Sequence, residues 1–474
     1  MSKPNYTDLL SSDKVAVIAP AGYGKTQAIC DMVSQLDGRQ LILTHTNAGV
    51  RVLKKRMEKE GVCSGKYQID TIASFCQQWC NAYPRTAGID EALSPQIDTD
   101  IYYTQLYEGA AKILSTEWAR SVLARSYSGL FVDEYQDCTI EQHSVVEAMV
   151  PCLPVRILGD PMQGIFEWNG NLVDMLNIGF PIEEPLTYPW RWHRANRELG
   201  SWIEDVRSQL LPTLRGQEVR LDIKPIPSVV QVCPDYRKIG GFFPRRGQRA
   251  VFLTSQAPIQ AKFARNFSYM FIHQETRECP ELHEFGSKLD STSSFDLARY
   301  LIEFAGRCMS KVKDELDSYL NRVEKRSRDF RRIQKHRDVG EILSEVIDAT
   351  EHVGASALRF MNYVESIDGV RVFRPELWVE AKRVIRYASE KRVSHAEAAI
   401  ALRSQPFRHE DYDRYNCVSS RTVLAKGLEF DVAIVDLRYD IDARNFYVAI
   451  SRATRRVVLL TKGKTELALC FKPQ

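Results

Sequence analysis

Short apolar runs rich in β-branched residues recur along the first 160 residues, and stretches with helical periodicity separate several of them. The runs are KVAVIA (14–19), QLILT (40–44), GLFVD (129–133) and VRILGD (155–160). Continuous apolar strands that alternate with helices are typical of a parallel sheet covered on both faces. The pattern therefore predicts an α/β domain with a parallel sheet.

A similar pattern returns later in the chain, in VVQVC (229–233), RAVFLT (249–254), SYMFI (268–272), DVAIVDL (431–437) and RVVLL (456–460). It predicts a second α/β domain. The segments 83–128 and 290–404 lack strand patterns and predict helices, as in FDLARYLIEFAGRCM and VGEILSEVIDATEHV. We expect one domain formed by 1–82 with 129–190, a second formed by 191–289 with 405–474, and helical insertions at 83–128 and 290–404.

The composition is that of a soluble globular chain with several domains. Of 474 residues, 44% are hydrophobic and 26% are charged, and the net charge of +3 neither indicates nor excludes a polyanionic partner. The start, MSKPNYTDLL, lacks the pattern of a signal peptide, and no run of eighteen apolar residues occurs, so we expect a cytoplasmic protein. The eleven cysteines include no C-x-x-C pair, and we expect reduced residues in the core.

The segment 307–337 is the most basic part of the chain, with eleven Lys and Arg residues against five Asp and Glu. We expect it to be helical. It is interpreted either as a solvated face with i, i+4 ion pairs or as a surface for nucleic-acid phosphates or an acidic protein. The sequence leaves both interpretations open.

A phosphate-binding loop is indicated by APAGYGKT (19–26), which follows an apolar strand and opens a helix. Small residues let backbone N–H groups converge on phosphates, Lys25 supplies a cation, and the Thr26 hydroxyl is a ligand for Mg²⁺. A second strand ends at Asp133 and Glu134, which suit Mg²⁺ binding and orientation of an attacking water. Gln163 follows a third strand. Three strand ends on one edge of a parallel sheet predict one nucleotide site.

The ordered set APAGYGKT, LTHTNAGVRVLKKRM, DTIASFC, VDEYQD, GDPMQGIFEWNG, PWRW, AKGLEF and YVAISRA resembles superfamily 1 DNA helicases of the UvrD, Rep and PcrA type over residues 19–453. The resemblance implies two RecA-like motor domains that hydrolyse ATP with Mg²⁺ and move 3′ to 5′ along single-stranded or partly duplex DNA. The chain is compact, and in this respect it is also similar to the helicase-like subunit of the Gabija anti-phage system. That similarity implies a partner nuclease, an ATPase-nuclease of the OLD family (overcoming lysogenization defect).

Residue by residue, the resemblance implies a role for each candidate at the ATP site. The implied cofactor-binding residues on the phosphates are Ala21, Gly22, Tyr23, Gly24, Lys25 and Thr26. Trp190 is implied on the adenine, and Gly427 and Glu429 at the nucleotide sugar. Thr26 and Asp133 are the implied metal ligands. The implied catalytic residues are Glu134 as base, Gln163 as γ-phosphate sensor, and Arg191 and Arg452 as the two arginines on the γ-phosphate. For either arginine the alternative is a surface salt bridge.

The DNA-binding candidates are His45, Thr46, Asn47, Thr71, Phe166 and Trp168. Bases gain roughly 1–3 kcal/mol each by stacking on aromatic faces, and Trp168 is the best stacking candidate, with a core tryptophan as the alternative. Several positions depart from the family pattern: the adenine-reading glutamine has no counterpart before the phosphate loop, and His45, Ala73, Asn169, Arg421 and Val423 replace its usual residues. ATPase chemistry is therefore better supported than unwinding.

Two other functions remain open at this stage. One is a nucleotide- or DNA-sensing regulatory subunit of a nuclease complex that unwinds nothing, which the departures on the DNA side favour. The other, a metabolic P-loop kinase, leaves the aromatic residues after Gln163 without a role.

Overall fold

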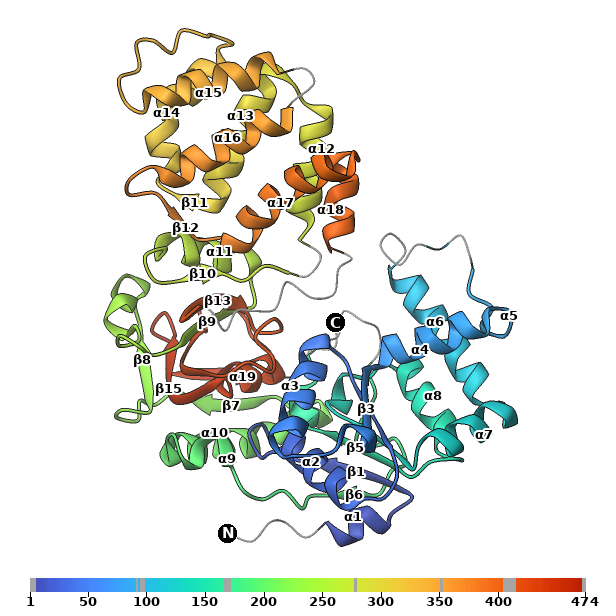
Figure 1. The fold of residues 1–474 in the computed structure, drawn as a ribbon. Coiled ribbons are helices and arrows are strands. Elements are labelled where there is room, and N and C mark those ends of the chain that lie inside the picture. The colour runs from blue at the N-terminus through green and yellow to red at the C-terminus, as the bar shows by residue number, and fades with distance from the viewer. Residues whose placement is uncertain are drawn as a thin grey trace. The chain divides into compact units, whose positions relative to one another are not determined.

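The structure is a computed structural model that describes residues 6–90, 93, 99–165, 172–276, 279–349, 353–403 and 415–470 (Figure 1). The chain forms two compact units. The first comprises Met1–Phe242 with Lys426–Gln474, and the second comprises Phe243–Ala425.

The first unit contains a six-stranded sheet with the order β3-β2-β4-β5-β1-β6. Its strands are β1 (Lys14–Ile18), β2 (Gln40–Thr44), β3 (Tyr67–Thr71), β4 (Gly129–Val132), β5 (Val155–Gly159) and β6 (Ile182–Glu183). All five strand pairs are parallel. The four strands predicted from apolar runs are confirmed. The edge strand β3 was not predicted, because its half-buried residues, such as Gln68, break the apolar run.

Helices flank this sheet: α1 (Thr7–Ser11), α2 (Lys25–Gln35), α3 (Asn47–Lys59), α4 (Ile72–Ala82), α5 (Pro84–Ala87), α6 (Thr99–Leu114), α7 (Glu117–Ser126) and α8 (Ile140–Met149). The segment 83–128 is helical as predicted, since α5, α6 and α7 all lie within it. One apolar core joins β1, β2, β4 and β5 to α4, α6, α7 and α8 through residues such as Phe75, Leu106 and Val145. Cys76 and Cys80 on α4 belong to this core.

A second six-stranded sheet has the order β10-β13-β9-β14-β15-β8. Its strands are β8 (Val230–Cys233), β9 (Ala250–Thr254), β10 (Ile272–His273), β13 (Cys417–Arg421), β14 (Phe430–Asp436) and β15 (Ala453–Leu460). The α/β class with two parallel sheets is thus confirmed. The strand predicted at 268–272 is largely wrong, because residues 268–270 form a turn and β10 shares only Ile272 with that run. β13 was not predicted because it carries the buried serines Ser419 and Ser420, and the Ser419 hydroxyl donates a hydrogen bond to the Gln260 carbonyl (2.8 Å).

The first unit also holds α9 (Trp190–His193), α10 (Arg197–Leu210), α19 (Ala443–Ile450) and the antiparallel pair β7 (Val219–Asp222) and β16 (Glu466–Leu469). Helix α10 buries one face, formed by Leu199, Ile203, Val206 and Leu210. Helix α19 is buried along most of its length. These two helices bring side chains from the last 50 residues and from the middle of the chain to the first sheet.

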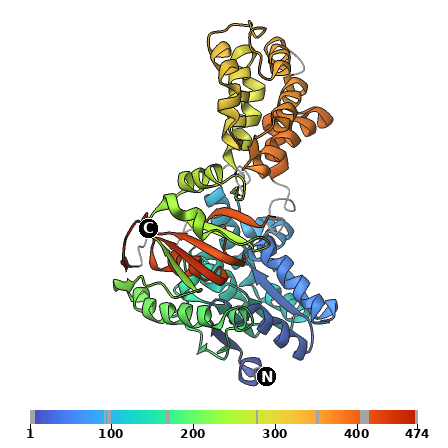
Figure 2. The same cartoon turned by 90° about the vertical axis from the view of Figure 1, so that its left-hand side faces the viewer.

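The second unit is mainly helical apart from its strands. Its helices are α11 (Ala257–Asn266), α12 (Pro280–Ser291), α13 (Ser294–Cys308), α14 (Val312–Glu324), α15 (Arg337–Asp348), α16 (Val353–Ser366), α17 (Pro375–Lys391) and α18 (His395–Arg403). Figure 2 shows α12 to α18, yellow to orange, side by side, and their buried side chains form a common apolar core. The helical segment begins at α12, earlier than the predicted 290. A short antiparallel pair, β11 (Met309–Ser310) with β12 (Arg371–Val372), corrects the prediction that 290–404 lacks strands.

The basic segment 307–337 is not one helix, which corrects the sequence prediction. α13 ends at Cys308, α14 spans Val312–Glu324, and no α-helix covers 325–336. Many of its basic side chains form ion pairs, including Arg307 with Glu284 (3.0 Å), Arg326 with Asp296 (3.0 Å) and Arg328 with Asp348 (2.7 Å). This pairing favours the solvated, ion-paired interpretation of the segment.

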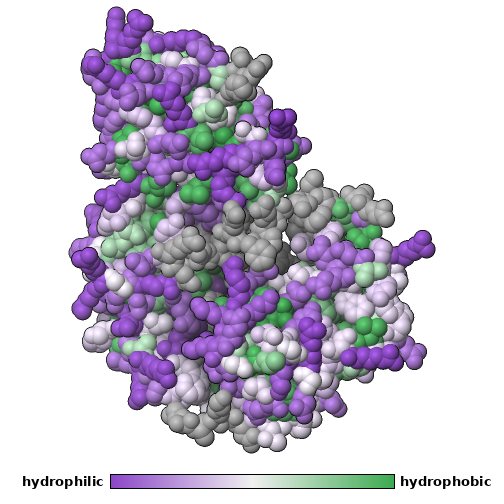
Figure 3. Space-filling view, in the orientation of Figure 1, coloured by the Kyte–Doolittle hydropathy of each residue, from purple (hydrophilic) through white to green (hydrophobic). Residues whose placement is uncertain are grey.

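The surface shows no gathering of apolar side chains on the face drawn in Figure 3, where hydrophobic residues are scattered among hydrophilic ones. Among the described residues, no helix combines the length and the apolar character needed to cross a membrane.

Candidate nucleotide site

Three adjoining strands of the first sheet end at the candidate site. β5 lies between β4 and β1, and all three run in the same direction. The phosphate loop follows β1, Asp133 follows β4, and Asp160 follows β5. The prediction that these strand ends meet on one edge is confirmed. Every described residue of the predicted ATP site lies in the first unit.

The phosphate loop has the backbone that its glycines allow. Gly22 (φ 74°) and Gly24 (φ 87°) are left-handed, and Lys25 begins α2 directly after them. A methyl group on Gly22 would meet the Arg191 Cβ at 2.8 Å, and one on Gly24 would meet the Trp190 Cδ1 at 3.1 Å. Both positions therefore require glycine for conformation and for space. The result is a helix N-terminus whose N–H groups suit an anion.

Lys25 is buried, and its Nζ donates hydrogen bonds to the carbonyls of Ala19 (3.0 Å) and Pro20 (3.4 Å). These carbonyls belong to the loop itself, so the ammonium group is held at the loop by neutral acceptors. Among the described residues no carboxylate forms a hydrogen bond with this ammonium group, so a phosphate group that enters the loop meets a cation without an acidic hydrogen-bond partner. This arrangement fits the polyphosphate of a nucleotide.

Asp133 and Glu134 stand at the end of β4 with the geometry that their predicted roles need. The Thr26 hydroxyl lies 3.4 Å from Asp133 Oδ2, so two oxygen donors of the kind that Mg²⁺ prefers face each other. Glu134 has the left-handed backbone (φ 56°, ψ 41°), which is costly for a residue other than glycine. Its N–H donates to Asp133 Oδ1 (3.0 Å), and Gln136 Nε2 donates to its carboxylate (2.5 Å). The strained backbone and these bonds fix both carboxylates.

The two neighbouring carboxyl groups are pushed toward different protonation states. Burial and the charge of Glu134 raise the pKa of Asp133. Burial also opposes ionisation of Glu134, but Lys25, Lys426 and the hydrogen bond from Gln136 outweigh it and lower the pKa of Glu134. Glu134 is therefore the ionised member at neutral pH, which is the state that a proton acceptor needs. A divalent cation beside Asp133 would favour its ionised form.

Gln163 and Arg452 meet at the same site although 288 residues of chain separate them. Arg452 Nη2 donates to Gln163 Oε1 (3.3 Å), and the guanidinium also donates to the carbonyl of Val448 (3.0 Å) and the hydroxyl of Ser451 (2.7 Å). Arg452 is 2% exposed, and no carboxylate of the described residues forms an ion pair with it. Burial and the charge of Arg191 lower its pKa to about 10, so it remains charged. A surface salt bridge is therefore excluded for Arg452.

Arg191, by contrast, has an acidic partner. Its Nε and Nη2 donate to the same oxygen of Glu429 (2.9 and 2.7 Å), and its Nη1 donates to the Ser451 carbonyl (2.9 Å). Its backbone N–H donates to the Gly22 carbonyl (3.1 Å). The structure thus places Arg191 and Glu429 together beside the phosphate loop. Their separate roles on the γ-phosphate and the sugar stay predictions.

Two further candidates border the site. Trp190 is 43% exposed beside Gly24, and the Tyr188 ring contacts it edge-on at 4.5 Å between centroids. An exposed indole next to the phosphate loop is available to stack on a base. Gly427 has a left-handed backbone (φ 81°) in the turn before Glu429, and this conformation explains the glycine.

The sequence did not single out four residues that complete the site: Asp160, Arg207, Lys426 and Tyr447. Asp160 is fully buried and accepts hydrogen bonds from Arg207 (3.0 Å), Gln163 (3.0 Å) and Tyr447 (3.1 Å). Lys426 contacts Asp137 and donates to the Gln163 carbonyl (2.5 Å). Asp160, Lys426 and Tyr447 lie inside the motifs GDPMQGIFEWNG, AKGLEF and YVAISRA, and this position was a signal in the sequence that could have identified them. Arg207 lies on α10, outside every motif, and only the fold brings it here.

The positions of the candidate DNA-binding residues give less support to their predicted role. The hydroxyls of Thr46 and Thr71 accept hydrogen bonds from the N–H groups of Gly49 and Ser74 (3.0 Å each), so both cap helices. Asn47 begins α3, and His45 Nε2 lies 3.5 Å from the Cys138 sulfur. Capping explains both threonines structurally, and their DNA contacts stay predictions. Phe166 and Trp168 lie outside the described residues.

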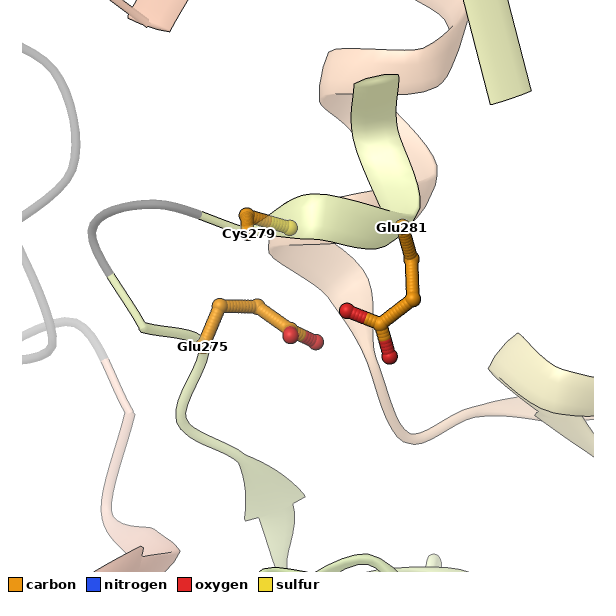
Figure 4. Close-up of side chains that lie close together, drawn as sticks. All are labelled: Glu275, Cys279 and Glu281. Atoms are coloured by element: carbon orange, nitrogen blue, oxygen red, sulfur yellow. The ribbon is translucent and has the colours of Figure 1, made fainter. Parts of the chain in front are cut away.

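A separate cluster in the second unit, Glu275, Cys279 and Glu281, has the residue types of a metal site (Figure 4). Arg374 already occupies it. Its Nε and Nη2 donate to the two oxygens of Glu275 (2.6 and 2.5 Å), and Nη2 lies 2.9 Å from Glu281. Burial raises the pKa of the Cys279 thiol to about 12, which disfavours the thiolate that binds metals. The cluster is a buried ion-pair group rather than a metal centre.

Residues 6–168 match a family model described as an AAA domain. The matched part includes the phosphate loop, Asp133, Glu134 and Gln163, and ends before Arg191, Glu429 and Arg452. It assigns a nucleotide-binding fold to this part of the chain. No curated protein matches the chain in sequence.

The solved structures to which the chain is similar include viral helicases. The complex of the arterivirus nonstructural protein 10 helicase with DNA is 9% identical, with a TM-score of 0.38, over 96% of this chain and 63% of that chain. A crystal structure of the arterivirus nonstructural protein 10 helicase is 10% identical, with a TM-score of 0.38, over 96% of this chain and 61% of that chain. The PRRSV helicase is 10% identical, with a TM-score of 0.35, over 98% of this chain and 56% of that chain. The chain thus spans less than two thirds of the length of these structures. Similarity this distant assigns no activity.

Proposed function

We propose that this chain is an ATP-dependent translocase or helicase that acts on single-stranded or partly duplex DNA. The observation that carries the proposal is the buried cluster in which Lys25, Asp133 and Glu134 share one site with the Gln163–Arg452 pair. A nucleotide-binding protein without a hydrolytic cycle has no need for a fixed, ionised Glu134 or for a buried guanidinium without a carboxylate partner. Both features suit phosphoryl transfer.

In this proposal ATP enters the loop between Gly22 and Thr26. The N–H groups at the start of α2 and the Lys25 ammonium bind the phosphates, Trp190 stacks on the adenine, and Glu429 holds the sugar. Mg²⁺, held by Thr26 and Asp133, neutralises phosphate charge when it is bound. Arg191 bonds to one oxygen of Glu429, Oε1, so Oε2 can accept a hydrogen bond from the sugar while the pair stays intact.

Hydrolysis follows from the placement of Glu134. The oxygen of a water molecule forms a bond to the γ-phosphorus, the bond to the bridging oxygen of ADP breaks, and Glu134 accepts a proton from the water. Arg452, Arg191 and the Gln163 amide bind the charge that develops on the transferring group. An arginine in this position contributes roughly 10³ to 10⁵ in rate.

The test is Mg²⁺-dependent ATP hydrolysis by the purified chain. We expect Glu134→Gln to lower kcat by about 10² or more while nucleotide binding persists, because only the proton acceptor is lost. Lys25→Ala should abolish hydrolysis. Glu108→Gln, at an exposed position on α6, is the matched control and should leave the rate unchanged. Hydrolysis that survives both substitutions within threefold would remove the site assignment.

Several parts of the proposal rest on the family resemblance alone. These are the 3′ to 5′ polarity, the contacts of His45, Thr46, Asn47, Thr71, Phe166 and Trp168 with DNA, and a partner nuclease of the OLD family in anti-phage defence. Strand displacement on substrates with a 3′ or a 5′ single-stranded tail tests the polarity.

A second candidate function is a nucleotide- or DNA-sensing regulatory subunit. The observation that favours it is that the hydroxyls of Thr46 and Thr71 serve as helix caps, which leaves the predicted DNA track with fewer free polar groups. Under this candidate the ATP cycle is intact and controls a partner, and the chain unwinds nothing.

A further inference from the structure

Tyr447 on α19 reaches the phosphate loop from a distant part of the sequence. Its side chain is fully buried, and its hydroxyl accepts a hydrogen bond from the Ala21 N–H (3.0 Å) and donates one to Asp160 Oδ2 (3.1 Å). A buried hydroxyl with both bonds made is stabilising, whereas a phenylalanine there would leave a buried N–H without an acceptor. The contact connects the loop after β1 with the loop after β5.

Asp160 connects Tyr447 to Gln163 through a second hydrogen bond. The same oxygen, Oδ2, accepts from Gln163 Nε2 (3.0 Å), while Oδ1 accepts from Arg207 (3.0 Å) and from the Met162 N–H (3.2 Å). Because the Gln163 Nε2 donates to Asp160, the side-chain oxygen Oε1 of Gln163 points to Arg452 and accepts a hydrogen bond from its Nη2 (3.3 Å). The orientation of the Gln163 amide is therefore set by Asp160, and the position of the Asp160 carboxylate is set partly by Tyr447.

We propose that Tyr447 is a positioning residue for hydrolysis, whose hydroxyl holds the phosphate loop and the Asp160–Gln163 pair in one fixed arrangement. The inference rests on the proposed ATPase function. This arrangement gives Ala21 a role that differs from direct phosphate binding, because its N–H already has an acceptor in the Tyr447 hydroxyl. Arg207 acts in the same network through the other oxygen of Asp160.

The test is Tyr447→Phe, which keeps the ring and removes only the hydroxyl. We expect kcat for ATP to fall about tenfold or more, because small misplacements of a catalytic group cost rate, while the dissociation constant for ADP changes less than threefold. Tyr319→Phe is the matched control, since that tyrosine is also buried and its hydroxyl bonds to the Lys335 and His336 carbonyls within the helical unit. It should lower the melting temperature without changing kcat.

A double-mutant cycle with Gln163→Ala separates positioning from general stability. If Tyr447 acts through Asp160 and Gln163, the kcat of the double variant should lie within about twofold of the kcat of Gln163→Ala alone. Fully additive losses, or a kcat of Tyr447→Phe within twofold of the unmodified chain, would overturn the inference. Should Tyr447→Phe fail to fold, Asp160→Asn takes its place, with the same expected loss of kcat and a full rate as the contrary result.

The same assay keeps the two proposals distinguishable. A chain without Glu134-dependent hydrolysis refutes the proposed function. A chain that hydrolyses ATP through Glu134 but tolerates the loss of the Tyr447 hydroxyl refutes only the role of Tyr447.

Discussion

At the residue scale, the site contains two unfavourable states, a strained backbone and a buried charge. Glu134 has a left-handed backbone, and Arg452 has a charged side chain that is 2% exposed and forms no ion pair with a carboxylate of the described residues. Burying an unpaired charge costs several kcal/mol in real proteins. Features of this kind persist at functional sites because the surrounding structure holds them in place. They indicate an anionic ligand beside Arg452.

Arg452→Met should therefore separate activity from stability. The substitution keeps a long side chain and removes a buried charge, so we expect an unchanged or higher melting temperature. The ATPase kcat should fall by about 10³ or more, because the arginine binds charge in the transition state, while nucleotide affinity changes little. Thermal melting and steady-state kinetics on the same preparation check both. A large drop in melting temperature would give Arg452 a folding role instead.

At the element scale, the elements of the second unit are tied together by charge as well as by apolar packing. Arg374, just before α17, bonds to Glu275 after β10 and to Glu281 on α12. Arg374 is 8% exposed and Glu275 is buried, so the pair lies out of solvent. Removing one member of such a pair leaves the other charge buried and uncompensated.

We expect Arg374→Met to destabilise the second unit by about 3–5 kcal/mol. Urea denaturation followed by circular dichroism measures the change, and hydrogen exchange should show the loss of protection in α12 and α17. Arg326→Met is the matched control, because Arg326 pairs with Asp296 at the exposed surface and such pairs contribute less than about 1 kcal/mol. Equal effects of the two substitutions would contradict the role given to the buried cluster.

The same scale shows what the sequence predicts and what it cannot. Strands that are buried on both faces, such as β1 and β5, are visible as apolar runs, and the residues at their ends predicted the site. β3 and β13 were not predicted because Gln68 and the buried Ser419 interrupt their apolar runs. The Ser419 hydroxyl donates its hydrogen bond to the Gln260 carbonyl, a partner that only the fold brings close. Arg207 was not predicted for a related reason. An arginine on an amphipathic helix is ordinary, and only the tertiary contact with Asp160 gives it a role, whereas Tyr447 lies inside the motif YVAISRA.

At the scale of the whole molecule, the open question is whether the ATP cycle drives movement along DNA or reports on it. A motor and a subunit that senses DNA both predict coupled binding of ATP and DNA. Coupling free energies between two sites are typically about 1–3 kcal/mol, and they are reciprocal for binding. Glu134→Gln, which should bind ATP without turnover, allows this coupling to be measured at equilibrium.

With Glu134→Gln we expect ATP to change the affinity for single-stranded DNA by roughly 5- to 150-fold, and DNA to change the affinity for ATP by the same factor. Fluorescence anisotropy of a labelled oligonucleotide and of a labelled nucleotide gives the two values, and Lys25→Ala is the control in which the coupling disappears. In the unmodified chain, a motor additionally shows hydrolysis that DNA stimulates and displacement of a duplex strand. Coupling without stimulated hydrolysis or displacement selects the sensing subunit, because nucleotide and DNA then only shift a binding equilibrium. Absence of coupling would contradict the motor and a subunit that senses DNA, since each requires the Lys25 site to communicate with DNA, and would leave a subunit that senses nucleotide alone.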